Sequence, residues 1–541
     1  MSLPKAKVQR TLYDAVALLE GLFPEGDRYR LFRGKVLPAL EAKRQELGSL
    51  YCEKNGRPAV DPVLALGVTL LQFMEKAPDR KAAENVRLHL GWKYALDMEV
   101  TEEGFHPTSL VNFRERLVAG CAARLGFDAL LDTLRQAGLV RKRSRQRLDS
   151  THVIGCVAKM SRLECMRETI RLLIEQVKRW GLEETLPDYV TYVERYCESQ
   201  VEWHRLDKQV LAKKTEDAGH DAWTLLAWLQ EQPEAIRGHR RAVLLKRVFG
   251  EQYELDSADT PRSKPESSGT VKNPHDPEAQ WAAKDLAKAT AWIGYKLQLA
   301  ETVPGSDEAK KKGDPTEQFI TEVTTTEAIA SDLDGMNRNL KAQAEHQDDQ
   351  PSELYVDTAY VTDDTLAQAQ EQGRELIGPA RKPGNPGQNI FDADRFHVDT
   401  AQRRAICPAG HVSRQCSLIN DQHVGSAYLR FEWAALCDEC PLKRQCTQRR
   451  DGRRHLSVGI HHALLQQRRR EMRTEPFRAR LRRRNAIEGT LSEFTRLGGR
   501  RTRYRGLSKT TLANYFQGAA LNANRWVRLL QWQIRQTQSA A

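Results

Sequence analysis

A β-prone run begins at residue 148 and reads Leu148-Asp149-Ser150-Thr151-His152-Val153-Ile154. Its residues alternate between two faces, as expected of a strand. Asp is depleted in strands, so Asp149 stands out as a candidate functional residue. A second short strand, expected over residues 353–357, ends on Asp357. Catalytic groups of open α/β sheets usually follow strand ends, which makes Asp357 the second candidate.

The chain of 541 residues is too long for one ordinary domain, and its pattern predicts an α/β protein interrupted by inserts. Residues 1–140 predict a helical N-terminal domain, in which Asp61 and Pro62 begin a helix as N-cap and first helical residue. The other expected segments are first core strands at 141–160, a helical insert at 161–255, the continued core at 256–380, a Cys-rich insert at 381–470, and a catalytic helix with a basic tail at 471–541.

The net charge of +12 is concentrated in one stretch. Residues 449–505 hold 18 Arg, no Lys and five acids, a net charge of +13. Arg makes two-pronged contacts with phosphate, so this stretch favours nucleic acid as partner. The alternative is a solvated helical face. The basic helices expected between 61 and 117 likewise suit either a small DNA-binding unit or a plain packing bundle.

Glu488 is a third candidate, on a helix expected from about 476 to 498. It flanks an apolar stripe formed by Ile487, Leu491 and Phe494 at helical spacing. Three carboxylates brought together repel one another, and a divalent cation removes that cost. Carboxylate oxygens suit Mg²⁺ or Mn²⁺. Spacing alone leaves the other interpretation open, in which each acid is a helix cap or an ion-pair partner.

Several motifs in order resemble the DDE transposases of bacterial insertion sequences. The first two acids lie in Arg147-Leu148-Asp149-Ser150-Thr151 and Tyr355-Val356-Asp357-Thr358-Ala359-Tyr360, and Glu488 lies in the third motif, residues 484–492. Residues 500–509 are typical of these transposases in general. Residues 273–279 and 294–296 are similar to the group with a Cys-bearing insert, and residues 56–117 to the helical N-terminal domain of that group. Two departures are Ala359, where many relatives have Gly, and Arg496 with Thr495, where many have Lys.

The resemblance implies a ribonuclease H-like catalytic core that holds two Mg²⁺ or Mn²⁺ ions at Asp149, Asp357 and Glu488. It implies cleavage of DNA at transposon ends and joining to target DNA, by homo-oligomers assembled on DNA. Backbone contacts with DNA are expected from Arg484, Arg496, Arg500, Arg501, Arg503, Arg505 and Lys509. Nearby acids that miss the motifs rank lower, namely Asp363, Asp364 and Glu493.

Two other functions remain open at this stage. One is a catalytically silent DNA-binding protein derived from a transposase, and the other is a metal-dependent nuclease that cuts without joining. The longest apolar-rich run, residues 63–74, is 12 residues and is too short to cross a bilayer, which needs about 20. No membrane association is expected, and a transposase of this kind would be cytoplasmic, bacterial and associated with the nucleoid.

The Cys-rich insert contains a knuckle spacing, Cys437-x2-Cys440, that suits tetrahedral Zn²⁺. Cys407 and Cys446 would complete four ligands, with His411 and Cys416 as substitutes. The alternatives are reduced buried thiols or a redox pair. The other cysteines are expected in hydrophobic cores, namely Cys52, Cys121, Cys156, Cys165 and Cys197.

Overall fold

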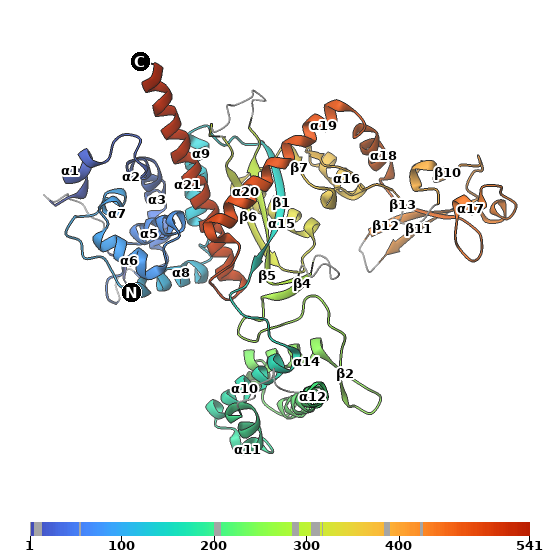
Figure 1. Cartoon of the computed structure of the whole chain (residues 1–541), viewed down its shortest axis with the longest axis horizontal. Helices are drawn as coiled ribbons and strands as arrows, with labels where there is room; N and C mark the ends of the chain where they lie inside the picture. Colours follow the sequence, from blue (N-terminus) through green and yellow to red (C-terminus); the bar gives the residue numbers. More distant parts are fainter. Residues whose placement is uncertain are drawn as a thin grey trace.

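The protein has a mixed α/β fold with a six-stranded sheet at its centre (Figure 1). The computed structural model describes residues 2–4, 13–52, 56–199, 207–283, 291–304, 314–315, 317–383, 390–421 and 426–540. Figure 1 shows the N-terminal helices on one side of the sheet, the Cys-rich insert on the opposite side and the helical insert below. Among the described helices, none has the length and apolar character to cross a membrane.

The central sheet combines antiparallel and parallel pairs. Its strands are β1 (Arg145–Ile154), β4 (Gln280–Ala283), β5 (Ala291–Thr302), β6 (Ile320–Glu327), β7 (Glu353–Tyr355) and β8 (Glu375–Ile377). One edge of β5 pairs antiparallel with β4 and β6, and the other pairs antiparallel with β1. Strands β7 and β8 continue the sheet parallel to β1. The order β6-β5-β1-β7-β8 therefore puts β1 at the centre.

Gly294 allows β5 to approach β1 closely. Its φ is 153°, and a Cβ there would overlap the carbonyl oxygen of Val153 and lie 2.6 Å from the backbone nitrogen of Gly155. We expect Gly294→Ala to lower the free energy of unfolding by about 1–3 kcal/mol, because backbone atoms must move apart. The measurement is the urea midpoint. Gly250→Ala is the control, because Gly250 lies in helix α14 (Arg240–Gln252) with open space around it. An unchanged midpoint for Gly294→Ala would contradict this account.

The N-terminal helices share one hydrophobic core with the sheet. They are α1 (Ala15–Leu19), α2 (Arg28–Leu31), α3 (Leu37–Glu41), α4 (Arg44–Gly48), α5 (Pro62–Glu75), α6 (Asp79–Leu88), α7 (Leu90–Ala95), α8 (Thr108–Ala119) and α9 (Leu125–Gln136). The Asp61 carboxylate accepts hydrogen bonds from the backbone nitrogens of Val63 and Leu64, which confirms the predicted start of α5. The long C-terminal helix α21 (Leu507–Ala540) packs between α5, α9 and β6, so the helical block is fixed to the sheet.

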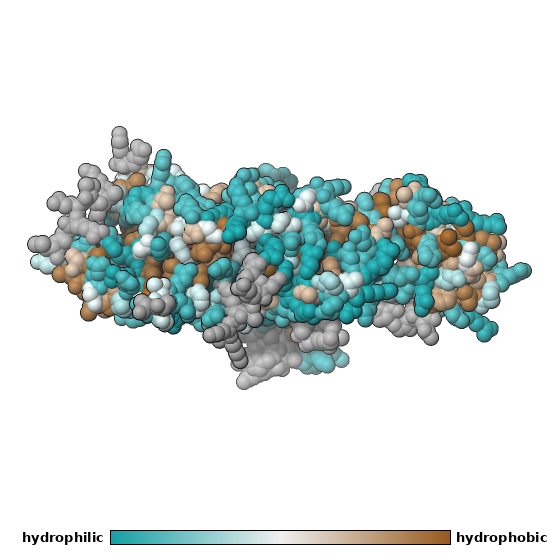
Figure 2. Space-filling view, turned by 90° about the horizontal axis from the view of Figure 1, so that it is seen from above, coloured by the Kyte–Doolittle hydropathy of each residue, from teal (hydrophilic) through white to brown (hydrophobic). Residues whose placement is uncertain are grey.

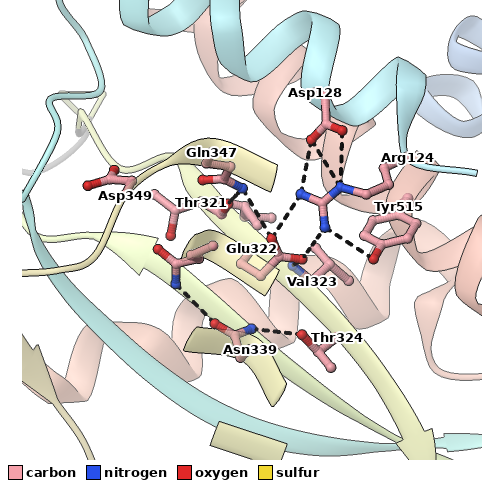
Figure 3. A network of polar contacts seen from close by, with 12 residues as sticks. Arg124, Asp128, Thr321, Glu322, Val323, Thr324, Asn339, Gln347, Asp349 and Tyr515 are labelled. Carbon is pink, nitrogen blue, oxygen red and sulfur yellow. Dashed lines mark hydrogen bonds and ion pairs between the residues drawn. The ribbon is translucent and has the colours of Figure 1, made fainter. Parts of the chain in front are cut away.

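A buried polar network also ties this block to the sheet (Figure 3). Arg124, at the start of α9, forms ion pairs of 3.0 Å with Asp128 and with Glu322 of β6. Glu322 is fully buried and also accepts a hydrogen bond from Gln347 at 3.1 Å. The hydroxyl of Tyr515 in α21 completes the cluster at 3.4 Å from Arg124. Four separate elements are therefore joined by one guanidinium and one carboxylate.

Two inserts have cores of their own. The helical insert holds α10 (Arg162–Trp180), α11 (Tyr189–Tyr192), α12 (Lys208–Gln230), α13 (Glu234–Arg237) and α14, followed by the hairpin of β2 (Tyr253–Leu255) and β3 (Pro261–Ser263). The Cys-rich insert holds β9 (His397–Asp399), β10 (Arg404–Ile406), β11 (Gln415–Asp421), β12 (Ser426–Glu432), α17 (Lys443–Cys446) and β13 (His455–Gly459). In Figure 2 the middle of the face is largely hydrophilic, and apolar residues gather toward the two ends.

The chain returns from the Cys-rich insert through α18 (His462–Glu471), and helix α15 (Asp332–Gln347) and helix α16 (Asp363–Glu371) flank the sheet. The single helix expected over about 476–498 is broken. Helix α19 (Glu475–Arg482) ends in a 3-10 turn at 483–485, and α20 (Ala486–Phe494) follows. The guanidinium of Arg147 on β1 donates a hydrogen bond of 2.9 Å to the carbonyl of Arg483. This bond takes up a carbonyl that a continuous helix would use, and it fixes the start of α20 against β1.

Candidate active site beside the central strand

Asp149 and Asp357 occupy matching positions on neighbouring parallel strands. In the pairing of β1 with β7, Gln146 lies opposite Leu354 and Arg147 lies opposite Tyr355. Continuing this register by two residues brings Asp149 beside Asp357, two residues beyond the end of β7. Both side chains are half-buried. The two predicted acids therefore lie together, although more than 200 residues separate them in the chain.

Each aspartate is held by a local backbone contact. Asp149 Oδ1 accepts a hydrogen bond of 2.7 Å from the nitrogen of Ser150. Asp357 Oδ1 accepts one of 2.7 Å from the nitrogen of Thr358, and it caps the 3-10 turn Thr358–Tyr360. Ala359 lies inside this turn, which forms without the Gly that many relatives have at this position. In each carboxylate, Oδ1 is held by the backbone nitrogen of the next residue.

Arg484 lies between Glu488 and Asp149. Arg484 Nη1 is 3.6 Å from Asp149 Oδ2, and Arg484 Nη2 is 3.6 Å from Glu488 Oε1. The side chain of Glu488 is 69% exposed, whereas that of Asp149 is 20% exposed. The guanidinium of Arg484 therefore lies between Asp149 and Glu488, and Asp357 is the carboxylate near Asp149 on the neighbouring strand. Glu488 lies at the open rim of this group.

The charge of Asp149 is only partly balanced. Burial raises the pKa of Asp149 above its ordinary value, and the nearby carboxylates of Asp357 and Asp332 raise it further, while Arg484 acts in the opposite direction. Asp332, at the start of α15, accepts a hydrogen bond of 3.0 Å from the hydroxyl of Ser150. Sequence reasoning missed Asp332, because no motif or periodicity distinguishes it from an ordinary first-turn acid. At Asp149, burial and the nearby carboxylates thus outweigh Arg484, while Asp332 is paired with Lys296 at 3.4 Å.

Across the described residues, no three His, Cys, Asp or Glu side chains lie close enough together to hold a metal ion. This applies to the acids beside β1 and to the cysteines of the insert. Arg484 contacts Asp149 and Glu488, and the three acids are not closed around one point. An ion at this position would need Glu488 to approach from its exposed position.

The basic residues expected to contact DNA fall into two groups. Arg500 is held against β1, where its Nη1 donates hydrogen bonds to Thr151 Oγ1 at 3.1 Å and to the carbonyl of His152 at 3.3 Å. Lys509 forms an ion pair of 3.0 Å with Glu115. The exposed members are Arg496, Arg501, Arg503 and Arg505. Of these residues, Arg500 and Lys509 are therefore engaged with the chain, and the other four are exposed.

Arg496 lines an open groove of about 400 Å³ with basic residues from distant parts of the chain. These are Arg28 and Lys76 of the N-terminal block and Arg528 of α21. Sequence reasoning missed Arg28 and Lys76, because neither belongs to the Arg-rich stretch. Glu493 also lines the groove and pairs with Arg528, and Arg28 pairs with Glu75, so part of this positive charge is offset by the chain's own acids.

Many arginines of the Arg-rich stretch, residues 449–505, form ion pairs or hydrogen bonds with other parts of the chain. Arg468 is 7% exposed and donates hydrogen bonds to the carbonyls of Leu376 and Gly378. Other residues with ion pairs or hydrogen bonds to the chain are Arg449, Arg453, Arg454, Arg469, Arg478, Arg480 and Arg482. The sequence count of +13 therefore overstates the charge open to a polyanion.

Four cysteines of the insert line one small cavity. They are Cys407, Cys437, Cys440 and Cys446, and His411 lies beside them. Cys416 packs against the same lobe but does not line the cavity. Burial raises the pKa of the Cys446 thiol to about 11, and the three neighbouring cysteines add to the effect. A thiol with so high a pKa is a poor nucleophile at neutral pH, which disfavours the redox interpretation.

The prediction for the five scattered cysteines was wrong for four of them. Cys165 is buried in the helical insert, but Cys52, Cys121, Cys156 and Cys197 are exposed. These four lie in loops or at helix ends, where the backbone stays at the surface. The spacing of scattered cysteines carries no information about burial.

Comparison with protein families gives two matches. Residues 17–116 match the family described as "Transposase domain (DUF772)", and residues 406–527 match the family described as "Transposase DDE domain". Both matches support a DDE transposase of an insertion sequence. No curated protein and no solved structure matches the transposase significantly.

The second match includes Arg484, Glu488 and the four cysteines of the cavity, while Asp149 and Asp357 lie between the two matched regions. A DDE transposase domain implies an enzyme that binds DNA and cleaves nucleic acid. The family match thus agrees with the functional class predicted from the sequence.

Proposed function

We propose that this transposase cuts DNA at the ends of its element and joins the released ends to target DNA at a divalent-metal site formed by Asp149, Asp357 and Glu488. The observation that carries the proposal is the convergence of these acids. Asp149 and Asp357 share a register position across two parallel strands, and Arg484 links Asp149 to Glu488 over 3.6 Å on each side. Three segments far apart in the chain supply these side chains.

The sheet supports a ribonuclease H-like core. Three antiparallel strands, β1, β5 and β6, are followed along the chain by helix α15 and then by two strands parallel to β1. The first acid lies on the central strand and the second after its parallel neighbour. The third acid lies on α20, which packs against β1.

The side chains fit a hard divalent cation. The donor set consists of carboxylate oxygens, which Mg²⁺ and Mn²⁺ prefer. The raised pKa of Asp149 reflects burial and like charge that Arg484 does not fully offset. When bound, two such ions would activate the attacking hydroxyl and stabilise the leaving oxygen in phosphoryl transfer.

The chain's own residues would orient the DNA. Arg484 is a monodentate partner of each acid at 3.6 Å, longer than a hydrogen bond, so it is free to turn toward a phosphate. The exposed Arg501, Arg503 and Arg505 follow α20 in the chain and would hold the DNA backbone beside the acids. The groove at Arg496 would hold a further segment, and more than one copy of the chain would be needed to bring two ends together.

The test uses a donor plasmid that carries the DNA flanking the gene, with a supercoiled target plasmid and either Mg²⁺ or Mn²⁺. We expect metal-dependent cleavage at both element ends and then joined product in the target. Cleavage without any joined product would favour a nuclease. Specific binding to the ends without cleavage in either metal would favour a catalytically silent DNA-binding protein. Either of these outcomes would overturn the proposal.

A further inference from the structure

The cavity in the Cys-rich insert combines thiols from three separate segments. Cys407 follows β10, Cys437 and Cys440 lie in the turn after β12, and Cys446 ends α17. The cavity measures about 20 Å³, which is room for one water molecule or one ion. Its walls are mainly apolar, with Phe391, Trp433, Leu436 and Leu442 around the sulfur atoms. Four cysteines from three segments thus border one space of atomic size.

The backbone presents these thiols in tight turns. The nitrogen of Cys407 donates to the carbonyl of His411 at 2.9 Å, and Gly410 donates back to the carbonyl of Cys407 at 2.9 Å. Gly410 has a φ of 81°, which side chains rarely adopt, so the turn requires glycine. The nitrogen of Cys440 approaches the carbonyl of Cys437 at 3.4 Å, which closes the second turn. Pairs of cysteine-bearing turns of this kind are how proteins build tetrahedral thiolate sites.

Positive charge lies next to the thiols. Arg454 and Lys443 both line the cavity. Arg454 also donates to the carbonyl of Cys446 at 3.1 Å and to that of Phe391 at 3.2 Å. Four thiolates around Zn²⁺ carry two net negative charges, and adjacent cations with fixed hydrogen bonds stabilise such a centre. The positive charges of Arg454 and Lys443 would therefore offset the negative charge of a zinc ion bound by four thiolates.

The lobe needs a cross-link to hold its shape. Its hydrophobic core consists of Phe396, Ala405, Leu429, Phe431, Trp433, Leu456 and Val458. A core of this size gives little stability to a segment of this length, and small lobes commonly rely on a metal or disulfides. All the described cysteines are free thiols. A bound metal would supply the missing stabilisation.

We infer that Cys407, Cys437, Cys440 and Cys446 form a structural zinc site that holds the Cys-rich insert together. The four thiols line the cavity but do not yet surround one point at ligand distance. Binding replaces four S–H bonds by four Zn–S bonds and releases four protons to solvent, with no change in oxidation state. The site is separate from the acids beside β1 and takes no part in phosphoryl transfer.

The first experiment measures the metal content of the full-length chain, purified under reducing conditions without chelator, by plasma mass spectrometry. We expect about one zinc per chain. Cys440→Ser should lose it, and Cys416→Ser should keep it, because Cys416 lies in the same lobe but outside the cavity. His411→Ala should also keep it. Absence of zinc from the unaltered chain, or equal loss in Cys416→Ser, would overturn the inference.

The second experiment does not depend on variants that may misfold. Limited proteolysis compares the chain before and after treatment with a strong zinc chelator. We expect cleavage within residues 390–461 to accelerate at least about tenfold on zinc removal and to be suppressed again by added zinc. Unchanged protection, or a disulfide between these cysteines in mass spectra of the protein as purified, would contradict a zinc site.

Discussion

Asn in place of Asp149 is expected to reduce DNA cleavage and joining by at least about 10³-fold. The substitution keeps the size of the side chain and its hydrogen bond from Ser150, but it removes the charge that a divalent ion needs. Asp357→Asn should have an effect of the same order, because Asp357 lies beside Asp149 across β1 and β7. DNA binding should stay within about threefold of the unaltered chain, since neither acid meets phosphate directly.

The measurements are single-turnover cleavage rates and binding of the same labelled DNA by each variant. Asp364→Asn is the matched control, because Asp364 lies in the first turn of α16, seven residues after Asp357, and outside the group around Arg484. Asp364→Asn should cleave at the parent rate. If Asp149→Asn cleaves as fast as Asp364→Asn, the acids beside β1 are not the reaction centre.

The sequence located the two strands that carry the site because their signals are local. Asp149 and Asp357 are acids within or just after β-prone runs, and both runs form strands. The helix of Glu488 was also expected, and the buried Ile487 and Phe494 confirm the apolar face predicted for it. The break before α20 was missed, because it depends on a hydrogen bond from Arg147, which lies 336 residues away in the chain.

The sequence does not show which charged side chains are bound by other parts of the chain and which are open to a partner. An arginine run looks the same whether its members meet phosphate or the chain's own carbonyls, and Arg468 does the latter. Likewise Glu301 and Glu322 resemble any strand glutamate, yet both side chains are fully buried. Whether a charge is buried depends on partners brought together by the tertiary fold, such as Arg124 for Glu322.

Glu301→Gln is expected to lower the free energy of unfolding by about 3–5 kcal/mol. Glu301 of β5 accepts a hydrogen bond from Arg147 Nε at 2.6 Å and another from Arg525 Nη1 at 2.9 Å. The side chains of these arginines are 2% and 9% exposed. Removing the carboxylate charge leaves two buried guanidinium groups with less compensation. The hydroxyl of Thr490 in α20 also loses its charged acceptor at 2.6 Å.

The measurement is the urea midpoint of unfolding, followed by amide hydrogen exchange in α20. Glu475→Gln is the matched control, because Glu475 pairs with Arg482 where both side chains are 65% exposed. The control should change stability by less than about 0.5 kcal/mol. A shift for Glu301→Gln no larger than that of the control would mean that the buried network does not hold the fold.

The hydrogen bonds of Glu301 also fix the position of α20, the helix that carries Glu488. Glu301 fixes Arg147, whose Nη1 holds the carbonyl of Arg483 at 2.9 Å, and Arg484 follows directly. On the opposite side, Glu301 holds Thr490, two residues after Glu488. Glu301→Gln should therefore speed amide hydrogen exchange in residues 484–494 relative to β6 at a urea concentration where the chain stays folded. Equal exchange in the two segments would show that α20 keeps its position against β1 without Glu301.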